Sequence, residues 1–263
     1  MGLAADLHQT VRDACLWLPE AEEFISHGSP NFRVRGKTFA TFVVNHHGDG
    51  RVALWLNAPP GSQDTHVRSE PKHFFVPPYV GPRGWVGVLL DQGLAWTRIV
   101  TLVREAYEKV APADLRARIG RTASVKAPAK ALTASQIDPL QSPKALRVLK
   151  SLRKICLALP ETHEARQFGH PVWQAGKKTF ALARHDGTRL ILCFWVGVDQ
   201  QGLLTADTRY HIPPYMGHNG WIALEVGADC DWREVHALCL QSYRHFALQR
   251  MLQQLPANAD GGP

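Results

Sequence analysis

Apolar residues recur at helical spacing near both ends of the first half of the chain. Val11, Cys15 and Leu18 form one such stripe, and Pro19 ends the helix that they predict. Residues 96–110 form a second stripe, whose apolar positions share one face of a longer helix.

Between these two helices the pattern changes to short runs with a period of two. Residues 32–35, 38–43 and 52–56 predict strands of an antiparallel meander, with glycine-rich turns between them. The polar stretch 61–72 has room for a short helix, and two more strands flank a Pro-Pro-Tyr-x-Gly-x-x-Gly-Trp element. The order is helix, three strands, short helix, two strands and helix. It predicts an α+β fold with an antiparallel β-sheet and helices packed on one face.

The whole pattern occurs twice. The sequence Cys-Leu-x-Leu-Pro-Glu at 15–20 returns at 156–161, and the match continues without a gap to residues 40 and 181. A second block, 76–85, returns at 212–221. Self-similarity of this kind indicates a duplicated domain.

We therefore expect two copies of one two-layer domain. The first copy spans residues 1–112 and the second spans 144–254, with 255–263 as a C-terminal tail. Apolar periodicity disappears in residues 113–143, where basic side chains stand among Ala, Pro, Ser and Thr. This composition predicts a basic, flexible linker.

Three features resemble the MmcQ/YjbR family of small bacterial proteins. They are the helix that ends in Leu-Pro-Glu, the Gly-Lys-Thr-Phe-Ala strand pair at 36–40, and the Pro-Pro-Tyr element with its Phe, Val, Gly and Trp neighbours at 75–85; the second copy shows all three. The resemblance implies an antiparallel two-layer fold, like that of secretion chaperones and frataxin-type domains. It also implies a DNA-binding role, which rests on fold analogy, and it supplies no catalytic residues. Most members look like a single domain, so a tandem arrangement departs from the usual pattern.

Charge is distributed unevenly along the chain. The net charge is +7, yet residues 1–112 hold 11 basic and 11 acidic side chains, so the excess lies further on. The residues that we expect to contact nucleic acid are Arg116, Arg118 and Arg121 in the linker, and Lys144, Arg147, Lys150 and Lys154 in the helix after it. Such a basic strip can follow a phosphate backbone without reading base sequence. The alternative is a solvated helix face whose charge only keeps the protein soluble.

The Pro-Pro-Tyr elements offer a second candidate surface. Tyr79, Trp85, Tyr215 and Trp221 could form an aromatic surface for a base or an apolar ligand. The alternative is that the four rings cap the core, because aromatic side chains at strand ends usually pack.

Other chemistry leaves no signature in the sequence. No Walker loop, dinucleotide-binding motif, nucleophile elbow or zinc-finger spacing occurs, and the five cysteines form no C-x-x-C pair. The pair His46-His47 is interpreted as a turn, and Cys15 and Cys156 as small buried apolar residues. We expect no catalytic residues, no metal and no cofactor, and hence a protein that is not an enzyme. The odd number of cysteines without a C-x-x-C pair argues against a disulfide framework and predicts a reducing cytoplasm. The sequence shows no signal-peptide pattern and no apolar run near about 20 residues, so we expect no membrane segment.

Two hypotheses for function follow. The first is a DNA- or RNA-binding protein whose contacts are mostly electrostatic. The second is a protein-interaction or chaperone-like module that uses the sheet faces and the Pro-Pro-Tyr elements. A small-ligand binder with a cleft between the copies is a third, with no motif behind it.

Overall fold

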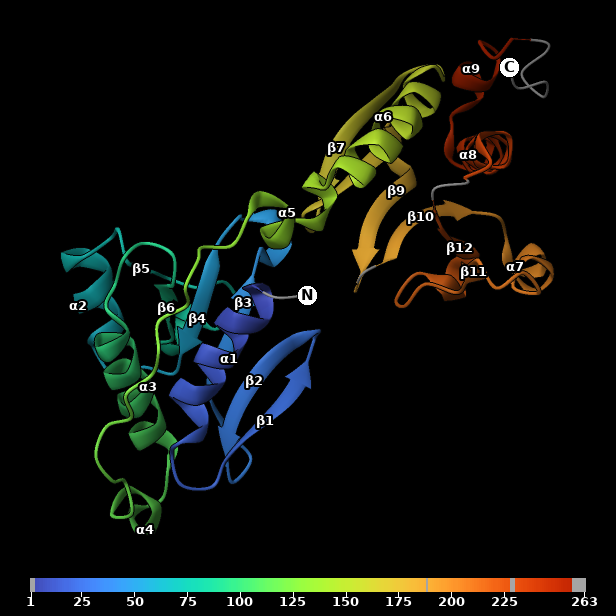
Figure 1. Ribbon diagram of the computed structural model, residues 1–263. Coiled ribbons are helices and arrows are strands. Elements are labelled where there is room, and N and C mark those ends of the chain that lie inside the picture. Colours follow the sequence, from blue (N-terminus) through green and yellow to red (C-terminus); the bar gives the residue numbers. More distant parts are fainter. Residues whose placement is uncertain (1–2, 188, 228–229, 257–263) are drawn as a thin grey trace. The chain divides into compact units, whose positions relative to one another are not determined.

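The computed structural model describes residues 3–187, 189–227 and 230–256 (Figure 1). The chain divides into two compact units, Met1–Ile137 and Asp138–Pro263. In each unit a six-stranded antiparallel sheet packs against helices, so the expected α+β class is confirmed for both copies. No helix in the described ranges combines the length and the apolar character that crossing a membrane requires.

The first unit contains one sheet, with strand order β1-β2-β3-β4-β6-β5. Its elements are α1 (Leu3–Leu16), β1 (Ala21–Ser26), β2 (Ser29–Val34), β3 (Lys37–Val44), β4 (Val52–Leu56), α2 (Ser62–Ser69), β5 (Phe74–Phe75), β6 (Val86–Leu89), α3 (Trp96–Val110), α4 (Ala113–Arg116) and α5 (Ala134–Ile137).

The second unit repeats this order, and its sheet runs β7-β8-β9-β10-β12-β11. Its elements are α6 (Pro143–Leu157), β7 (Thr162–Gln167), β8 (His170–Ala175), β9 (Lys178–Asp186), β10 (Arg189–Trp195), α7 (Val198–Leu204), β11 (Tyr210–His211), β12 (Trp221–Glu225), α8 (Trp232–Phe246) and α9 (Gln249–Leu252), preceded by a short 3-10 helix at Pro139–Gln141.

The first and last long helices of each unit pack on the same face of its sheet. In the first unit, Val11 and Cys15 of α1 share a core with Ile99, Val103 and Tyr107 of α3. The apolar stripes read from the sequence therefore mark the buried helix faces.

A matching hydrogen bond ties the last helix of each unit to the end of the first. The Tyr107 hydroxyl donates to the Pro19 carbonyl at 2.7 Å, and the Tyr243 hydroxyl donates to the Pro160 carbonyl at 2.9 Å. Both tyrosine rings are fully buried, so this bond satisfies a phenol inside the core. Its presence in both units shows that the duplication extends to the details of packing.

Each sheet has four strands between its first two helices, one more than we expected. The additional strands are β1 and β7, which pair in antiparallel register with β2 and β8. Neither strand contains a buried residue, because each lies at a sheet edge and packs only partly. Without a buried face, the alternation that marks a strand in sequence is missing.

The segment 113–143 differs from the expected free linker. Leu115 is fully buried in the first core, and Leu132 and Ile137 pack against it. The Lys126 carbonyl accepts a hydrogen bond from Thr10 of α1 at 3.2 Å. Residues 113–137 therefore belong to the first unit, and the boundary between units lies after Ile137. Residues 257–263, which we assigned to the tail, lie outside the described residues.

Each sheet also buries a small apolar cluster on the face opposite its main core. In the first unit this cluster contains Val43, Ala53, Trp55 and Trp85. In the second unit it contains Ile191, Cys193, Trp221 and Ala223. We call this side of each sheet the outer face.

Candidate functional site

Helix α6 begins at a well-formed N-terminus. The Ser142 hydroxyl accepts a hydrogen bond from the backbone N–H of Ala145 at 3.2 Å, and Pro143 occupies the first helical position. A buried stripe then fixes the orientation of the helix against the sheet; it consists of Ala145, Val148, Leu149, Leu152 and Cys156. Burial of this stripe turns the opposite face of α6 toward solvent.

The four basic residues predicted on this helix all lie on the exposed face. Lys144, Arg147, Lys150 and Lys154 are exposed, and none makes an ion pair with an acidic side chain in the part of the chain that the structure describes. We call these four residues the basic face. Unpaired exposed cations keep their full charge available for a polyanion.

Arg153 on the same helix behaves differently. Its guanidinium forms two hydrogen bonds with the Glu164 carboxylate of β7, at 2.5 and 2.8 Å. These bonds raise the pKa of Arg153. An equivalent ion pair joins Arg12 of α1 to Glu23 of β1, so this contact braces the first helix in both units.

The first unit has no counterpart of the basic face. Counting from the matched cysteines, Asp6 and Asp13 of α1 stand where α6 has Arg147 and Lys154. The two helices share a fold and a brace but carry opposite charges at these positions. The charge of α6 is therefore not required by the packing of the domain.

The three arginines predicted in the linker lie in the first unit, whereas α6 lies in the second. Arg116, Arg118 and Arg121 are all exposed. Arg118 forms an ion pair with Glu20 at 2.9 Å, and Glu20 also binds Arg35 at 3.0 Å. These contacts lower the pKa of the Glu20 carboxyl, and the Arg35 hydrogen bond contributes most. Part of the predicted linker charge is thus already paired within the first unit.

The Pro-Pro-Tyr elements separate their aromatic side chains into two groups. Trp85 and Trp221 are only 9% and 7% exposed and pack in the outer-face clusters, so they do not belong to a free aromatic surface. Tyr79 and Tyr215 are 68% and 89% exposed. The two tyrosines have φ of 62° and 67°, a left-handed conformation that a bulky residue adopts at a cost. The predicted aromatic surface is therefore reduced to these two tyrosines.

A buried glutamine that we did not predict holds each Pro-Pro-Tyr element in place. The Gln201 amide nitrogen donates to the carbonyls of Gly217 and Trp221, both at 2.6 Å. Gln63 does the same at the matched carbonyls of the first unit, at 2.8 and 2.5 Å. The only sequence signal is that each glutamine follows the matched strand residues Leu56 and Phe194 by seven positions, within two otherwise different stretches.

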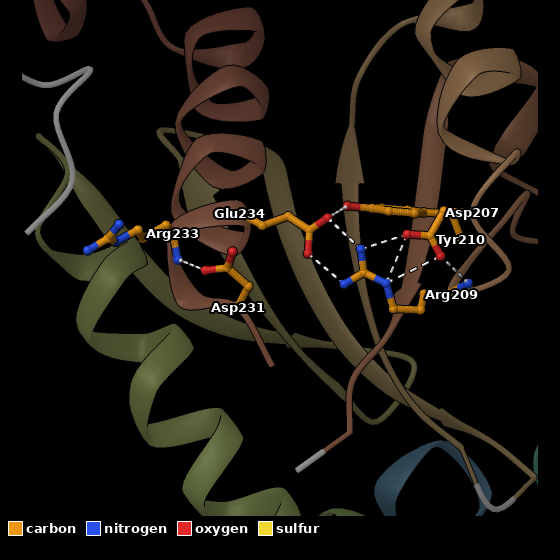
Figure 2. A network of polar contacts seen from close by, with 6 residues as sticks. All are labelled: Asp207, Arg209, Tyr210, Asp231, Arg233 and Glu234. Atoms are coloured by element: carbon orange, nitrogen blue, oxygen red, sulfur yellow. Dashed lines mark hydrogen bonds and ion pairs between the residues drawn. The ribbon is translucent and has the colours of Figure 1, made fainter. Parts of the chain in front are cut away.

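An ionic network joins β11 to the first turn of α8 in the second unit (Figure 2). Arg209 lies between Asp207 and Glu234, with contacts of 2.6 and 2.8 Å. The Tyr210 hydroxyl donates to Glu234 at 2.6 Å. Burial, followed by this hydrogen bond, raises the pKa of Tyr210. Asp207 and Glu234 are therefore both engaged in ion pairs with Arg209, and the network holds the start of β11 against α8.

A pocket of about 340 Å³ lies beside this network. Its lining includes Leu224, Glu225, Cys230, Asp231 and Glu234. Asp231 already caps α8, because its carboxylate accepts the Arg233 backbone N–H at 2.9 Å. Burial and the nearby acids raise the pKa of the Cys230 thiol, which disfavours a nucleophilic thiolate.

The paired histidines lie in a turn that contacts Tyr79. The His47 Nε2 atom is 3.0 Å from the Tyr79 hydroxyl, and the His46 ring packs edge-on against Trp55 at 4.9 Å. Burial lowers the pKa of His46. Within the described ranges, no three His, Cys, Asp or Glu side chains are grouped as a metal site requires.

All five cysteines are free thiols. Cys15 and Cys156 occupy matched, fully buried positions, as we expected. In the second unit the Cys156 and Cys239 sulfurs are 3.5 Å apart, and burial raises the pKa of Cys156 well above its ordinary value. These thiols act as core residues.

Similarity to known proteins follows the two copies. A family model described as YjbR matches residues 16–109 and again residues 157–245. The crystal structure of a Deinococcus radiodurans protein with a DUF419 domain shares 19% identity with this chain; the match covers 41% of this chain and 83% of that one, with a TM-score of 0.35. No curated protein matches the chain.

The two family matches agree with the architecture. Each begins near the end of the first helix of a copy and ends in or near the last long helix, α3 or α8. Together they span well over half of the chain. The chain therefore belongs to the YjbR family and carries the family's domain twice.

Proposed function

We propose that this protein binds DNA or RNA through the phosphate backbone, without reading base sequence, and has no catalytic activity of its own. The basic face of α6 carries the proposal. Four cations stand on one exposed helix face, while the neighbouring Arg153 is neutralised by Glu164. Cations without internal partners can replace the counterions that surround a nucleic acid.

The spacing of the basic face fits this role. Lys144 and Lys154 are ten positions apart on one helix, roughly 15 Å at 1.5 Å per residue. One strand of a duplex passes about four phosphates over that length, at about 3.4 Å per phosphate along the axis. Four cations thus face a comparable number of phosphates.

The size of the salt effect follows from the number of cations. Release of about four counterions gives a slope near −3.6 for the logarithm of the duplex binding constant against the logarithm of salt concentration. Lack of base contacts predicts similar affinities for duplexes of unrelated sequence.

Fluorescence anisotropy of a labelled duplex across a salt series tests the proposal. The informative variant is Arg147→Asp with Lys154→Asp, which gives α6 the acids that α1 carries at these positions. Because α1 folds with those residues, the variant should remain folded. We expect it to lose at least tenfold in affinity and to reduce the salt slope by about two.

A matched control separates local contact from net charge. Arg166→Asp with Lys177→Asp changes the charge by the same amount at two exposed positions outside α6. The control should bind nearly as well as the unaltered protein. Equal losses in the two variants, or no binding by the unaltered protein at low salt, would refute the proposal.

A second candidate is a protein-interaction module. The large apolar side chains that the second unit exposes include Leu203, Ile212 and Tyr215. If this function is correct, a defined co-purifying partner should be lost on Ile212→Ser with Tyr215→Ser and retained on Arg147→Asp with Lys154→Asp. The opposite pattern would favour the basic face.

A further inference from the structure

The outer faces of the two sheets differ in chemistry at matched positions. In the first unit, Val43 pairs with Ala53, Trp55 pairs with Thr41, and Phe75 pairs with Gly87. Val43, Ala53, Trp55 and Trp85 form an apolar cluster, and Phe75 packs against it. At its edge the Arg51 guanidinium lies over the Phe75 ring at 4.2 Å, and the His46 ring packs edge-on against Trp55 at 4.9 Å.

The second unit replaces three of these apolar side chains. By strand register, Arg184 stands in place of Val43, Cys193 in place of Trp55, and His211 in place of Phe75. A thiol is far smaller than an indole, so less side-chain volume covers the sheet at this position of the outer face. The guanidinium of Arg184 and the imidazole of His211 now lie on this face.

The residues of the sheet beneath these two side chains are tightly packed. Ile191, Cys193 and Ala223 are fully buried although they lie on the side of the sheet away from α6 and α8. Burial raises the pKa of the Cys193 thiol to about 12, and the positive charge of the nearby Arg184 opposes that shift. Arg184 therefore lies within electrostatic reach of the thiol, which stands where the first unit has its indole.

Three polar atoms at this place have no hydrogen-bond partner in the part of the chain that the structure describes. They are Nε and Nη2 of Arg184 and Nε2 of His211, and all three are shielded from solvent. An unsatisfied buried donor costs about 1–3 kcal/mol, and more when it is charged. Such groups call for a ligand or water that completes them.

The nearby acids do not supply the missing partner. Asp186 lies 3.2 Å from Arg189, and Glu225 lies 3.8 Å from the same guanidinium. Arg189 thus engages both carboxylates. Burial, then the charges of Arg189 and Arg184, lower the pKa of His211, so the imidazole is within electrostatic reach of both arginines.

We propose that the outer face of the second sheet binds a small oxyanion of the phosphate type between Arg184 and His211, above Cys193. The guanidinium provides a bidentate, permanently charged donor for two anion oxygens. The imidazole Nε2 provides a third donor in its protonated form or in the matching neutral tautomer. Arg184 and His211 are both only half-buried residues, so their polar ends can turn toward an entering anion.

This inference does not rest on nucleic-acid binding by α6. The anion can be free phosphate or a phosphate group carried by a larger molecule, since both present the same oxygens. The first unit lacks the same pair of donors, because Val43 and Phe75 stand at the matched positions.

Urea unfolding in phosphate, compared with chloride at equal ionic strength, tests the site. The informative variants are Arg184→Val and His211→Phe, which restore the side chains of the first unit. Phosphate should raise the unfolding midpoint of the unaltered protein, and each variant should weaken the apparent phosphate affinity at least tenfold. Arg166→Val, at an exposed position on β7, should leave the phosphate response intact.

The variants must be shown to fold before the result is used. The unfolding midpoint of Arg184→Val in chloride should equal or exceed that of the unaltered protein, because an unsatisfied buried cation is removed. A proton NMR titration of the unaltered protein should show phosphate raising the pKa of His211. An equal phosphate response in Arg184→Val, or no response in the unaltered protein, overturns the proposal.

Competition distinguishes the sources of the anion. If free phosphate at saturating concentration, with ionic strength held constant, leaves DNA binding unchanged, the outer-face site and the basic face are separate. If phosphate displaces DNA only from the protein with Arg184 intact, the site takes the phosphate of the nucleic acid. Loss of DNA binding by the α6 variant with an unchanged phosphate response would separate the two proposals completely.

Discussion

Arg98 and Glu234 occupy equivalent positions in the first turn of the last long helix of their units, and they make the same ion pair with the charges exchanged. Arg98 binds Glu70 through two hydrogen bonds of 2.7 and 2.6 Å. Glu234 binds Arg209 through two hydrogen bonds of 2.8 and 3.0 Å. In the first unit the pair joins the end of α2 to α3, and in the second unit it joins the residue before β11 to α8, with the charges exchanged.

The exchange predicts how the second unit responds to loss of one partner. Glu234→Gln removes the anion that Arg209 and the Tyr210 hydroxyl share. We expect a loss of about 1–2 kcal/mol in the free energy of unfolding, moderated because the Arg209 side chain is 47% exposed. Urea denaturation measures it, and the double variant Arg209→Glu with Glu234→Arg should recover part of the loss. A double variant less stable than either single change would contradict the exchange.

Gln201 should be more important than its neutral side chain suggests. Gln201→Leu leaves the carbonyls of Gly217 and Trp221 without their donor. The expected loss is about 2–3 kcal/mol, since two buried acceptors become unsatisfied. Thermal unfolding gives the measurement, and the exposed Gln253→Leu is the control. A change as small as that of the control would show that the amide does not hold the element.

Acidification should destabilise the protein before its carboxylates titrate. Burial lowers the pKa of His8, His46, His185 and His211 in the folded state. The unfolded chain then binds protons more readily, so the stabilisation is complete above about pH 6.5 and is lost as the pH falls below that value. Urea midpoints at pH 7.5, 6.5 and 5.5, in buffers without phosphate, should fall steadily. Their decline should be shallower in His211→Phe, and midpoints that rise on acidification would refute the prediction.

If the exposed tyrosines contact nucleic acid, binding should depend on unpaired bases, which the basic face of α6 does not recognise. If Tyr79 and Tyr215 stack on unpaired bases, Tyr79→Ala with Tyr215→Ala should weaken binding to a single-stranded oligonucleotide by fivefold or more. Binding to a strand of the same length with abasic sites should not change. Leu203→Ala, another exposed apolar position, serves as the control. An equal loss on both strands would show that the tyrosines contribute no stacking.

Residues with a periodic environment were predictable. The helix at 96–110 has the same bounds in the structure, because its apolar face is continuous over the whole length. The strands at 38–43 and 52–56 were found because each pairs on both sides and buries most of its residues. Burial at regular intervals along a helix or strand produces a regular pattern of apolar residues in the sequence.

Other features depended on contacts between distant segments. β1 was missed because none of its residues is buried, so its sequence lacks the apolar alternation that marks a strand. Gln201 was missed because a buried amide looks like any polar residue until its two carbonyl partners are in place. The packing of 113–137 on the first unit depends on Leu115 and a few scattered apolar residues, which a stretch rich in Ala and basic residues conceals.

The separation of the two main cores has an evolutionary consequence. Every residue of one main core precedes position 138, and every residue of the other follows it. A substitution that alters binding chemistry in one unit therefore leaves the composition of the other main core unchanged. Duplication of this kind gives a lineage a spare copy, in which Arg147 and Arg184 can arise where Asp6 and Val43 stand without risking the folding of both halves.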